Sequence, residues 1–450
     1  MSAMNPSKLL TLALACAFCA PAMAQESLLD IYQRALQNDP AIREAEATYR
    51  AQAEVKPQTR SGLLPSLSLG STRSGRFSDA SGGFTLPQGG TSGSRTVSRQ
   101  SSQNLSISLS QTLFDWSLYA QLKQADKRVV RAETDYEAAK QQLLIRVATA
   151  YFNVLAAEDN LASAVAAREA IARQLEQANR RFEVGLIAIT DVQQSQAGFD
   201  TAVADEIDAQ RALATSQEQL REIIGVIVDE LAGPTDNLPL LSPDPADAEE
   251  WVRMALSQNL ALVSQRLATD IASDQIDIDR GNRLPTLSLS AGYSNSTSES
   301  VQTNFPPGER RPSTTEPEGR NWSIDLRFPI FTGGLNRSRI QQSVYLHRAA
   351  TETLERIARQ TERQTRDAYL GVTSAISRVG ALRQAVESNR TALRATEAGF
   401  EVGTQTTVDV LNTQNQLRRA ETEYSRSRYQ YMLDILSLKQ AAGNLTVADL

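Results

Sequence analysis

Four short segments of the chain alternate apolar and polar residues with a period of two. One pair begins at Leu67 and Leu105; a second begins at Leu287 and at Trp322, the last running to Ile330. Such a period places apolar side chains on one face of a strand and mostly Ser, Asn, Gln or Thr on the other. Each segment has close to the roughly 9 to 11 residues that a tilted strand needs to cross a bilayer. The pattern therefore predicts four membrane-spanning strands, two in each half of the chain.

The residues between the paired strands have a different composition. Residues 78–99 and 298–320 are rich in Gly, Ser, Thr and Pro and carry little apolar material. This composition is typical of turns and loops. We expect two exposed loops that connect the strands.

Two much longer segments are predicted to be helices. Residues 117–180 and 335–398, about 64 residues each, contain no proline and little glycine. At about 1.5 Å per residue each would span on the order of 95 Å, more than a globular core needs. In the second segment apolar residues recur at every seventh position, namely at Val372, Val379, Val386, Leu393 and Phe400. A seven-residue repeat on a helix of 3.6 residues per turn drives a left-handed supercoil, so we expect coiled coils.

Shorter helices are predicted at residues 28–56, 191–224, 246–280 and 407–440. Two of them stacked end to end match one long helix in length. The simplest assembly is a tall helical cylinder below a sheet.

The same order of features occurs twice along the chain. Phe182-Glu-Val-Gly185 recurs as Phe400-Glu-Val-Gly403 at an offset of 218 residues, and the segment 64–69 recurs at 284–289. Chance similarity would not preserve the order, so a duplicated unit of about 200 residues is indicated. We expect a first structural repeat at residues 25–233, a linker at 234–245 and a second repeat at 246–450. Each repeat reads helix, strand, strand, long helix, helix.

The N-terminus predicts export from the cytoplasm. Lys8 precedes an apolar stretch at residues 9–20, and Ala22-Met-Ala24 has the small-x-small pattern of a signal-peptide cleavage site. We expect residues 1–24 to be a signal peptide cut after Ala24. The alternative, an anchor helix, needs about 20 apolar residues. No later segment approaches 18 uninterrupted apolar residues, so a membrane role would have to come through strands.

The amino-acid composition argues against most kinds of enzyme. The 450 residues include one histidine, His347, and two cysteines, Cys16 and Cys19, both before the expected cut. General bases, nucleophiles and soft-metal ligands depend on those residue types, and no nucleotide-binding, hydrolase or zinc motif is found. The formal charge of −6 supplies no positive field for phosphate backbones. We expect no enzyme activity, no cofactor, no metal and no nucleic-acid partner.

Four strands from one chain cannot close into a membrane barrel. In lipid, each unpaired strand edge leaves N–H and C=O groups without partners, and barrels of this kind have an even number of at least eight strands. A symmetric oligomer in which each chain donates four strands solves this. The arithmetic permits a dimer, a trimer or a tetramer, and a trimer gives twelve strands.

These features resemble the TolC-like outer-membrane efflux protein family, the outer membrane factors of tripartite pumps. The resemblance rests on the signal peptide, the paired LPxLxL strand starts, the AYF and AYL segments at 150–152 and 368–370, and the paired FEVG…DV turns. It implies an α+β membrane protein: a homotrimeric 12-stranded outer-membrane β-barrel in outer-membrane lipid, continued by a long α-helical coiled-coil periplasmic tunnel with a tapered tip. It further implies docking on a periplasmic adaptor (membrane fusion) protein, which connects the duct to an inner-membrane transporter. Small toxic molecules, or unfolded proteins in type I secretion, would leave unchanged.

The resemblance also implies roles for the two hairpin turns at the tip. In this family they are the usual adaptor contact, and the matching residues are Val184, Gly185, Leu186, Val402, Gly403 and Thr404. A turn between antiparallel helices needs a residue with positive φ, which glycine supplies without a Cβ clash. The alternative is that these glycines only end helices.

A periplasmic gate is implied next to these turns. In the family prototype it comprises rings of aspartates and bonds among a Tyr, an Arg, a Thr and an Asp. Here Asp409 matches the first aspartate and Asn412 stands at the second, while Thr190 and Asp191 match the Thr/Asp pair, Phe400 replaces the Tyr and Gln405 replaces the Arg. Because this gate lacks the Tyr hydroxyl and the Arg guanidinium, we expect its closed state to be weaker than that of the family prototype. Asp191 and Asp409 can equally be first-turn helix residues favoured by the helix dipole.

Two other functions stay open at this point. The duct of a type I protein secretion system would have the same channel sequence. A structural periplasmic coiled-coil protein would explain the heptads and the signal peptide, but not four alternating strands.

Overall fold

The computed structural model describes residues 25–85, 90–228, 230–234, 239–306 and 308–450. The predicted signal peptide, residues 1–24, lies outside this range. The described chain forms two compact units. One contains the residues up to 47 together with 135–263 and 357–450, and the other contains residues 48–134 and 264–356.

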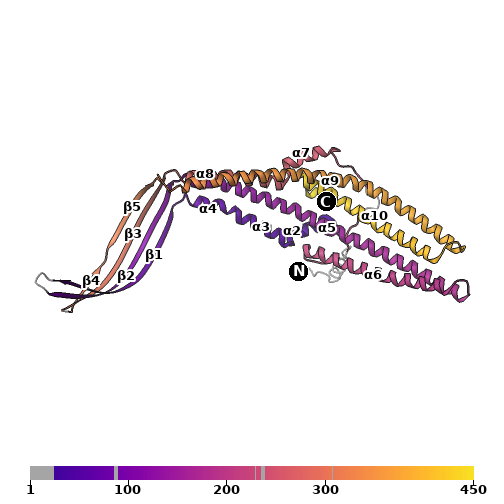
Figure 1. The fold of residues 1–450 in the computed structure, drawn as a ribbon, viewed down its shortest axis with the longest axis horizontal. Helices are drawn as coiled ribbons and strands as arrows, with labels where there is room; N and C mark the ends of the chain where they lie inside the picture. Colours follow the sequence, from indigo (N-terminus) through magenta and orange to yellow (C-terminus); the bar gives the residue numbers. More distant parts are fainter. Residues whose placement is uncertain (1–24, 86–89, 229, 235–238, 307) are drawn as a thin grey trace, which may run out of the picture. The chain divides into compact units, whose positions relative to one another are not determined.

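The second unit holds an antiparallel sheet with the order β1-β2-β3, in which both β4 and β5 pair with β3 (Figure 1). Pro317 lies between β4 and β5 and cannot donate a ladder hydrogen bond. The strands are β1 (Ser66–Thr85), β2 (Thr91–Phe114), β3 (Thr286–Phe305), β4 (Glu309–Thr315) and β5 (Glu318–Arg327).

The expectation of loops at residues 78–99 and 298–320 was wrong, because strands run through most of both segments. β1 and β2 stay paired from Ser66↔Ser110 to Thr85↔Thr91. Main-chain hydrogen bonds hold this pairing and do not require apolar side chains. Apolar side chains recur at every second position only in the part of each strand next to the helices, so the alternation marks only about half of each strand. The prediction also overran at Ile330: β5 ends at Arg327, shortly before Pro329.

The two faces of the sheet differ as the alternation predicts. Exposed apolar side chains share one face, including Leu67, Leu69, Leu105, Ile107, Trp322, Ile324 and Leu326. The other face carries hydroxyls that pair across strands: Ser68 with Ser108 at 2.6 Å, and Ser290 with Ser323 at 2.7 Å. An exposed apolar band backed by a polar face is the pattern of a strand between lipid and water.

Helices adjoin the sheet within the same unit. They are α4 (Val55–Ser61), most of α8 (Leu260–Gly281), the end of α3 (Pro40–Ala53) and the first parts of α5 (Trp116–Glu183) and α9 (Leu335–Glu401). Buried Asp274 of α8 pairs with Lys127 of α5 at 2.7 Å and with Lys123 at 3.3 Å. Gln124 donates to the carbonyl of Ile271 at 2.9 Å. These bonds fasten α8 to α5.

The first unit is helical. It contains the remainders of α5 and α9 with α2 (Leu28–Asn38), α6 (Ile189–Ile224), α7 (Ala248–Gln258), α10 (Thr407–Ala442) and the 3-10 turn η2 (Val447–Asp449). The two long helices are confirmed. The segments expected as single helices at 28–56 and 246–280 are broken, at Asp39 before Pro40 and at Asn259, because both break residues have extended ψ values. Among the described residues no helix is long and apolar enough to cross a membrane.

Two cores lie in this unit. One is built from α2, α5, α6 and α10 and includes Ile31, Leu143, Val147, Tyr151, Leu220 and Ile224. The other joins α7, α9 and α10 and includes Trp251, Val372, Val379 and Tyr431. The heptad residues Val372, Val379 and Val386 are buried, which confirms this part of the seam predicted for α9, whereas Leu393 and Phe400 are only partly buried.

Candidate functional site

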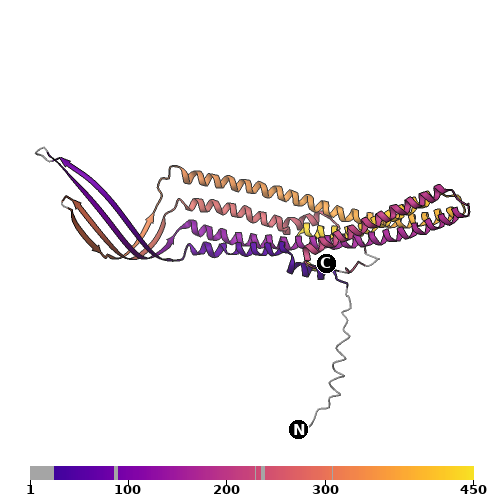
Figure 2. The same ribbon diagram turned by 90° about the horizontal axis from the view of Figure 1, so that it is seen from below.

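Two helical hairpins, α5–α6 and α9–α10, lie side by side in the first unit (Figures 1 and 2). Gly185 and Gly403 are in the left-handed region at their turns, with φ of 73° and 78°. In the first turn the N–H of Leu186 donates to the carbonyl of Arg181 at 2.9 Å. In the second, Thr404 donates to Gly399 at 2.8 Å. These bonds are the Schellman pattern, which satisfies the last helix carbonyls and requires a positive φ, so the predicted reason for both glycines is confirmed.

The turns present apolar side chains to solvent. Val184, Leu186 and Val402 are 70%, 73% and 76% exposed, and Thr404 is exposed beside them. Exposing side chains of this size has no benefit for an isolated hairpin. Clustered exposed apolar residues mark surfaces that bind other molecules.

Asp409 has a structural partner at the start of α10. The hydroxyl and the N–H of Thr406 donate to one oxygen of the Asp409 carboxylate, at 2.7 and 2.9 Å, and the Asp409 N–H returns a bond to that hydroxyl. This is a capping box. The hydrogen bonds from Thr406 lower the pKa of Asp409 from its ordinary value, so the carboxylate is ionised at neutral pH.

The other expected gate residues lie near the turns without forming a network. Thr190 and Asp191 are in the first turn of α6, and in the described chain no side-chain bond joins them to Phe400 or Gln405. The Gln405 side chain packs over Gly399, where a Cβ would meet it at 2.7 Å. Asn412 lines a cavity of about 300 Å³ between α5, α6 and α10.

A contact that the sequence analysis missed joins the two hairpins. The guanidinium carbon of Arg181, at the end of α5, lies 4.9 Å from the centre of the Phe400 ring at the end of α9. This geometry is a cation–π interaction. The sequence contains a difference that could have indicated this contact. Arg181 and Gly399 occupy equivalent positions immediately before the two FEVG sequences, so only the first turn has a cation at that position.

A second interaction between the two hairpins lies farther from the turns. Arg418 of α10 pairs with Asp205 of α6 at 2.8 Å. Between this pair and the turns, Gly198 of α6 packs under Leu411, where a Cβ would come within 3.0 Å of the Leu411 side chain. α6 and α10 are therefore both closely packed and linked by charge.

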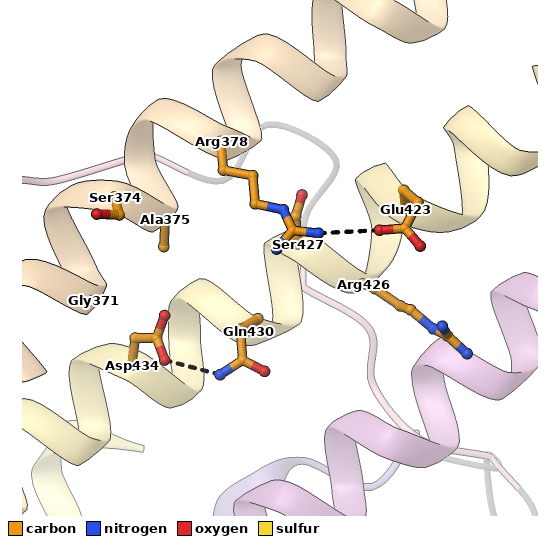
Figure 3. A pocket seen from close by; sticks show the side chains of 9 residues that line it. All are labelled: Gly371, Ser374, Ala375, Arg378, Glu423, Arg426, Ser427, Gln430 and Asp434. Carbon is orange, nitrogen blue, oxygen red and sulfur yellow. Dashed lines mark hydrogen bonds and ion pairs between the residues drawn. The ribbon is translucent and has the colours of Figure 1, made fainter.

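A groove between α9 and α10, about 450 Å³ in volume, is lined by charged and polar side chains (Figure 3). Arg378 reaches from α9 to Glu423 of α10 at 3.1 Å. Gln430 donates to Asp434 at 2.8 Å, and burial raises the pKa of Asp434. No group of three or more His, Cys, Asp or Glu side chains that could hold a metal ion occurs within the described ranges.

Comparisons with known proteins agree with this architecture. The model of the family described as "Outer membrane efflux protein" matches residues 31–226 and 251–444. The chain is 36% identical to the outer membrane protein TolC of Vibrio cholerae serotype O1, over 94% of this chain and 92% of that one. It is 29% identical to the alkaline protease secretion protein AprF of Pseudomonas aeruginosa, over 94% and 85%. A crystal structure of CusC superposes with a TM-score of 0.73 at 17% identity, covering 93% of this chain and 92% of that chain.

Proposed function

The chain belongs to the outer membrane efflux protein family, and from this premise we propose that it is the exit duct of a tripartite efflux pump. It is an outer-membrane protein with a periplasmic tunnel, and it conducts cargo outward in efflux or secretion. Its family is one of channels rather than enzymes. The observation that carries the proposal is that the family match spans both halves of the chain.

The assembly we propose is a homotrimer with a 12-stranded barrel, in which β4 and β5, both paired with β3, count as one interrupted strand. Its support is the sheet itself: among the described residues β1 pairs only with β2, and β4 and β5 pair only with β3. An open edge in lipid leaves main-chain groups without partners. Neighbouring copies would close the edges by pairing β1 of one with β5 of the next. The two structural repeats at 25–233 and 246–450, the linker at 234–245 and cleavage after Ala24 are parts of the same proposal.

Efflux and type I secretion differ in what the duct carries: small toxic molecules in the first, unfolded proteins in the second. Type I secretion stays an alternative because one relative of this chain is named for protease secretion. Deleting the gene and measuring drug susceptibility together with the secreted proteins tests both. Drug sensitivity with unchanged secretion is expected, whereas loss of a secreted protein alone would favour the alternative. A structural coiled-coil protein, the remaining class, would yield no heat-modifiable species in detergent-extracted outer membranes.

The exposed hairpin turns are the proposed contact for a periplasmic adaptor, which links the duct to an inner-membrane transporter. Val184→Cys and Val402→Cys should crosslink to a co-expressed adaptor through a short bifunctional reagent. The valines are preferable to the glycines because positive φ strains any other residue. Arg211→Cys, whose side chain is 80% exposed on α6 away from the turn, should remain unlinked. Equal labelling at all three positions, or at none, would contradict the contact.

The Arg181–Phe400 contact is proposed to hold the gate closed in place of the absent Tyr and Arg. Arg181→Gln removes the cation, and an interaction of about 0.5–1 kcal/mol corresponds to about a two- to fivefold rise in the open-to-closed ratio. Single-channel recording in planar bilayers measures this ratio. Arg180→Gln is the control, since Arg180 is bound to Glu176 of its own helix. If the channel opens no more often after Arg181→Gln than after Arg180→Gln, the Arg181–Phe400 contact does not hold the gate closed.

A further inference from the structure

The apolar face of the sheet is bordered by arginines on its two edge strands. On β1 this face continues from Leu67 and Leu69 through Ser71 to Arg73. On β5 the exposed Trp322 is preceded, on the same face, by Arg320. Both arginines lie on the side of the apolar band that faces the strand-to-strand turns. In the proposed barrel this is the outer boundary of the membrane.

Neither arginine has a carboxylate partner at hydrogen-bond distance, since the only ion pair of the two, between Arg320 and Glu318 in the described chain, is long. In the part of the chain that the structure describes, no ion pair or hydrogen bond of the Arg73 side chain occurs, and the residue is exposed. The Arg320 side chain is 82% exposed, and the nearest carboxylate oxygen, of Glu318, is 3.6 Å away. Its guanidinium carbon instead lies 5.9 Å from the centre of the Tyr293 ring on β3. Both side chains can therefore bind a ligand without breaking a strong internal bond.

Two arginines farther from the apolar band also have contacts within the sheet. Arg95 donates two hydrogen bonds to Asp79, at 2.6 and 3.0 Å. Arg99 lies over the ring of Phe77 at 5.7 Å. Arg95 is held by two hydrogen bonds to a carboxylate, whereas Arg320 has only a long ion pair and a ring contact, which a phosphate can replace at little cost.

The depth of the two arginines specifies the partner. A guanidinium beside the last apolar rows of a lipid-facing strand lies at headgroup level, and a tyrosine at that level is typical of a membrane interface. Phosphate is the anionic group that headgroups offer, and arginine binds it through two parallel N–H···O bonds. Acyl chains of the same lipid would cover the apolar band.

We propose that Arg73 and Arg320 bind the phosphates of outer-leaflet lipid. The inference rests on the proposed function, in which β1 of one subunit lies beside β5 of the next. The two arginines then stand on neighbouring strands of the same face. A phosphorylated lipid held by both fastens adjacent subunits together as well as anchoring the barrel.

The test uses the full-length protein purified in detergent, with lipid A carrying both phosphates as the probe. Binding is measured by native mass spectrometry and by the temperature at which the oligomer dissociates on a gel. The double variant R73Q/R320Q should bind about tenfold more weakly. Arg76→Gln is the matched control, because Arg76 is on the same strand but on the hydroxyl face, and it should bind as the unchanged protein does. Dephosphorylated lipid A and inorganic phosphate should each fail to raise the dissociation temperature.

Unaltered binding by R73Q/R320Q, or equal binding of the dephosphorylated lipid, would overturn the proposal. So would an equal loss in Arg76→Gln, because binding would then depend only on net charge. Ion conduction by the same preparations in planar bilayers is recorded separately. Absence of conduction in every variant would count against the exit duct, whereas conduction with unaltered lipid binding would count against the lipid site alone.

Discussion

Replacing Gly443 by alanine is expected to destabilise the helical unit strongly. Gly443 ends α10 with φ of 81°, and a Cβ there would overlap the carbonyl oxygen of Gln258 at the end of α7. The left-handed conformation costs a non-glycine residue about 1–2 kcal/mol, and relieving the overlap with main-chain atoms adds about 1–3 kcal/mol. We expect a loss of about 2–5 kcal/mol in the free energy of unfolding, measured by urea titration of the purified protein in detergent.

Gly225 provides the matched control. It ends α6 with a nearly identical φ of 80°, but its Cβ position has only the Asn38 side chain nearby, at 3.9 Å. Gly225→Ala should therefore cost about 1–2 kcal/mol, the conformational part alone. Equal losses in the two variants would show that the contact between α10 and α7 contributes nothing.

Replacing Asp409 by asparagine is expected to remove the cation preference of the channel. In the proposed trimer three copies of this residue would lie near the axis, and like charges about 4 Å apart repel by roughly 4 kcal/mol at an effective dielectric near 20. Such a ring attracts cations. We expect block by a trivalent cation to weaken by at least about tenfold, which corresponds to about 1.4 kcal/mol of lost attraction. Single-channel recording measures the blocking constant.

A second variant separates charge from capping. Thr406→Ala keeps the Asp409 charge but removes the hydroxyl of the capping box, at a cost of about 1 kcal/mol in helix stability. It should retain cation block. If Thr406→Ala loses block while Asp409→Asn keeps it, Asp409 is a helix cap and not a gate.

The pH dependence follows from the same bonds. Hydrogen bonds from Thr406 lower the pKa of Asp409 below its ordinary value of 3.8. The carboxylate is therefore ionised throughout neutral and mildly acidic pH, and its capping contribution is lost only as the pH falls through the lowered pKa. Cation block should stay constant from pH 7 to about pH 5 and weaken below about pH 4. A midpoint near pH 6 would mean that repulsion within the ring outweighs the cap.

The long helices could be predicted from the sequence because their signals are local. Proline-free segments and a seven-residue repeat predicted α5 and α9 to within a few residues, and the buried valines of α9 are those of the repeat. The turn glycines were likewise predictable, since a Schellman turn depends on a single residue with positive φ. The strand ends were not, because they carry Ser, Thr and Gly without an apolar face, and that composition is also typical of loops.

What the sequence determined by itself is therefore the period and the turns: coiled-coil helices, one apolar face on each strand, and two hairpin tips that require glycine. What only the tertiary structure decided is which distant residues meet. Arg181 with Phe400, Arg418 with Asp205, and Gly443 with Gln258 are each separated by more than 180 positions. The physical reason is that periodicity is enforced by the backbone within a few residues, whereas these contacts depend on how whole helices are aligned against one another.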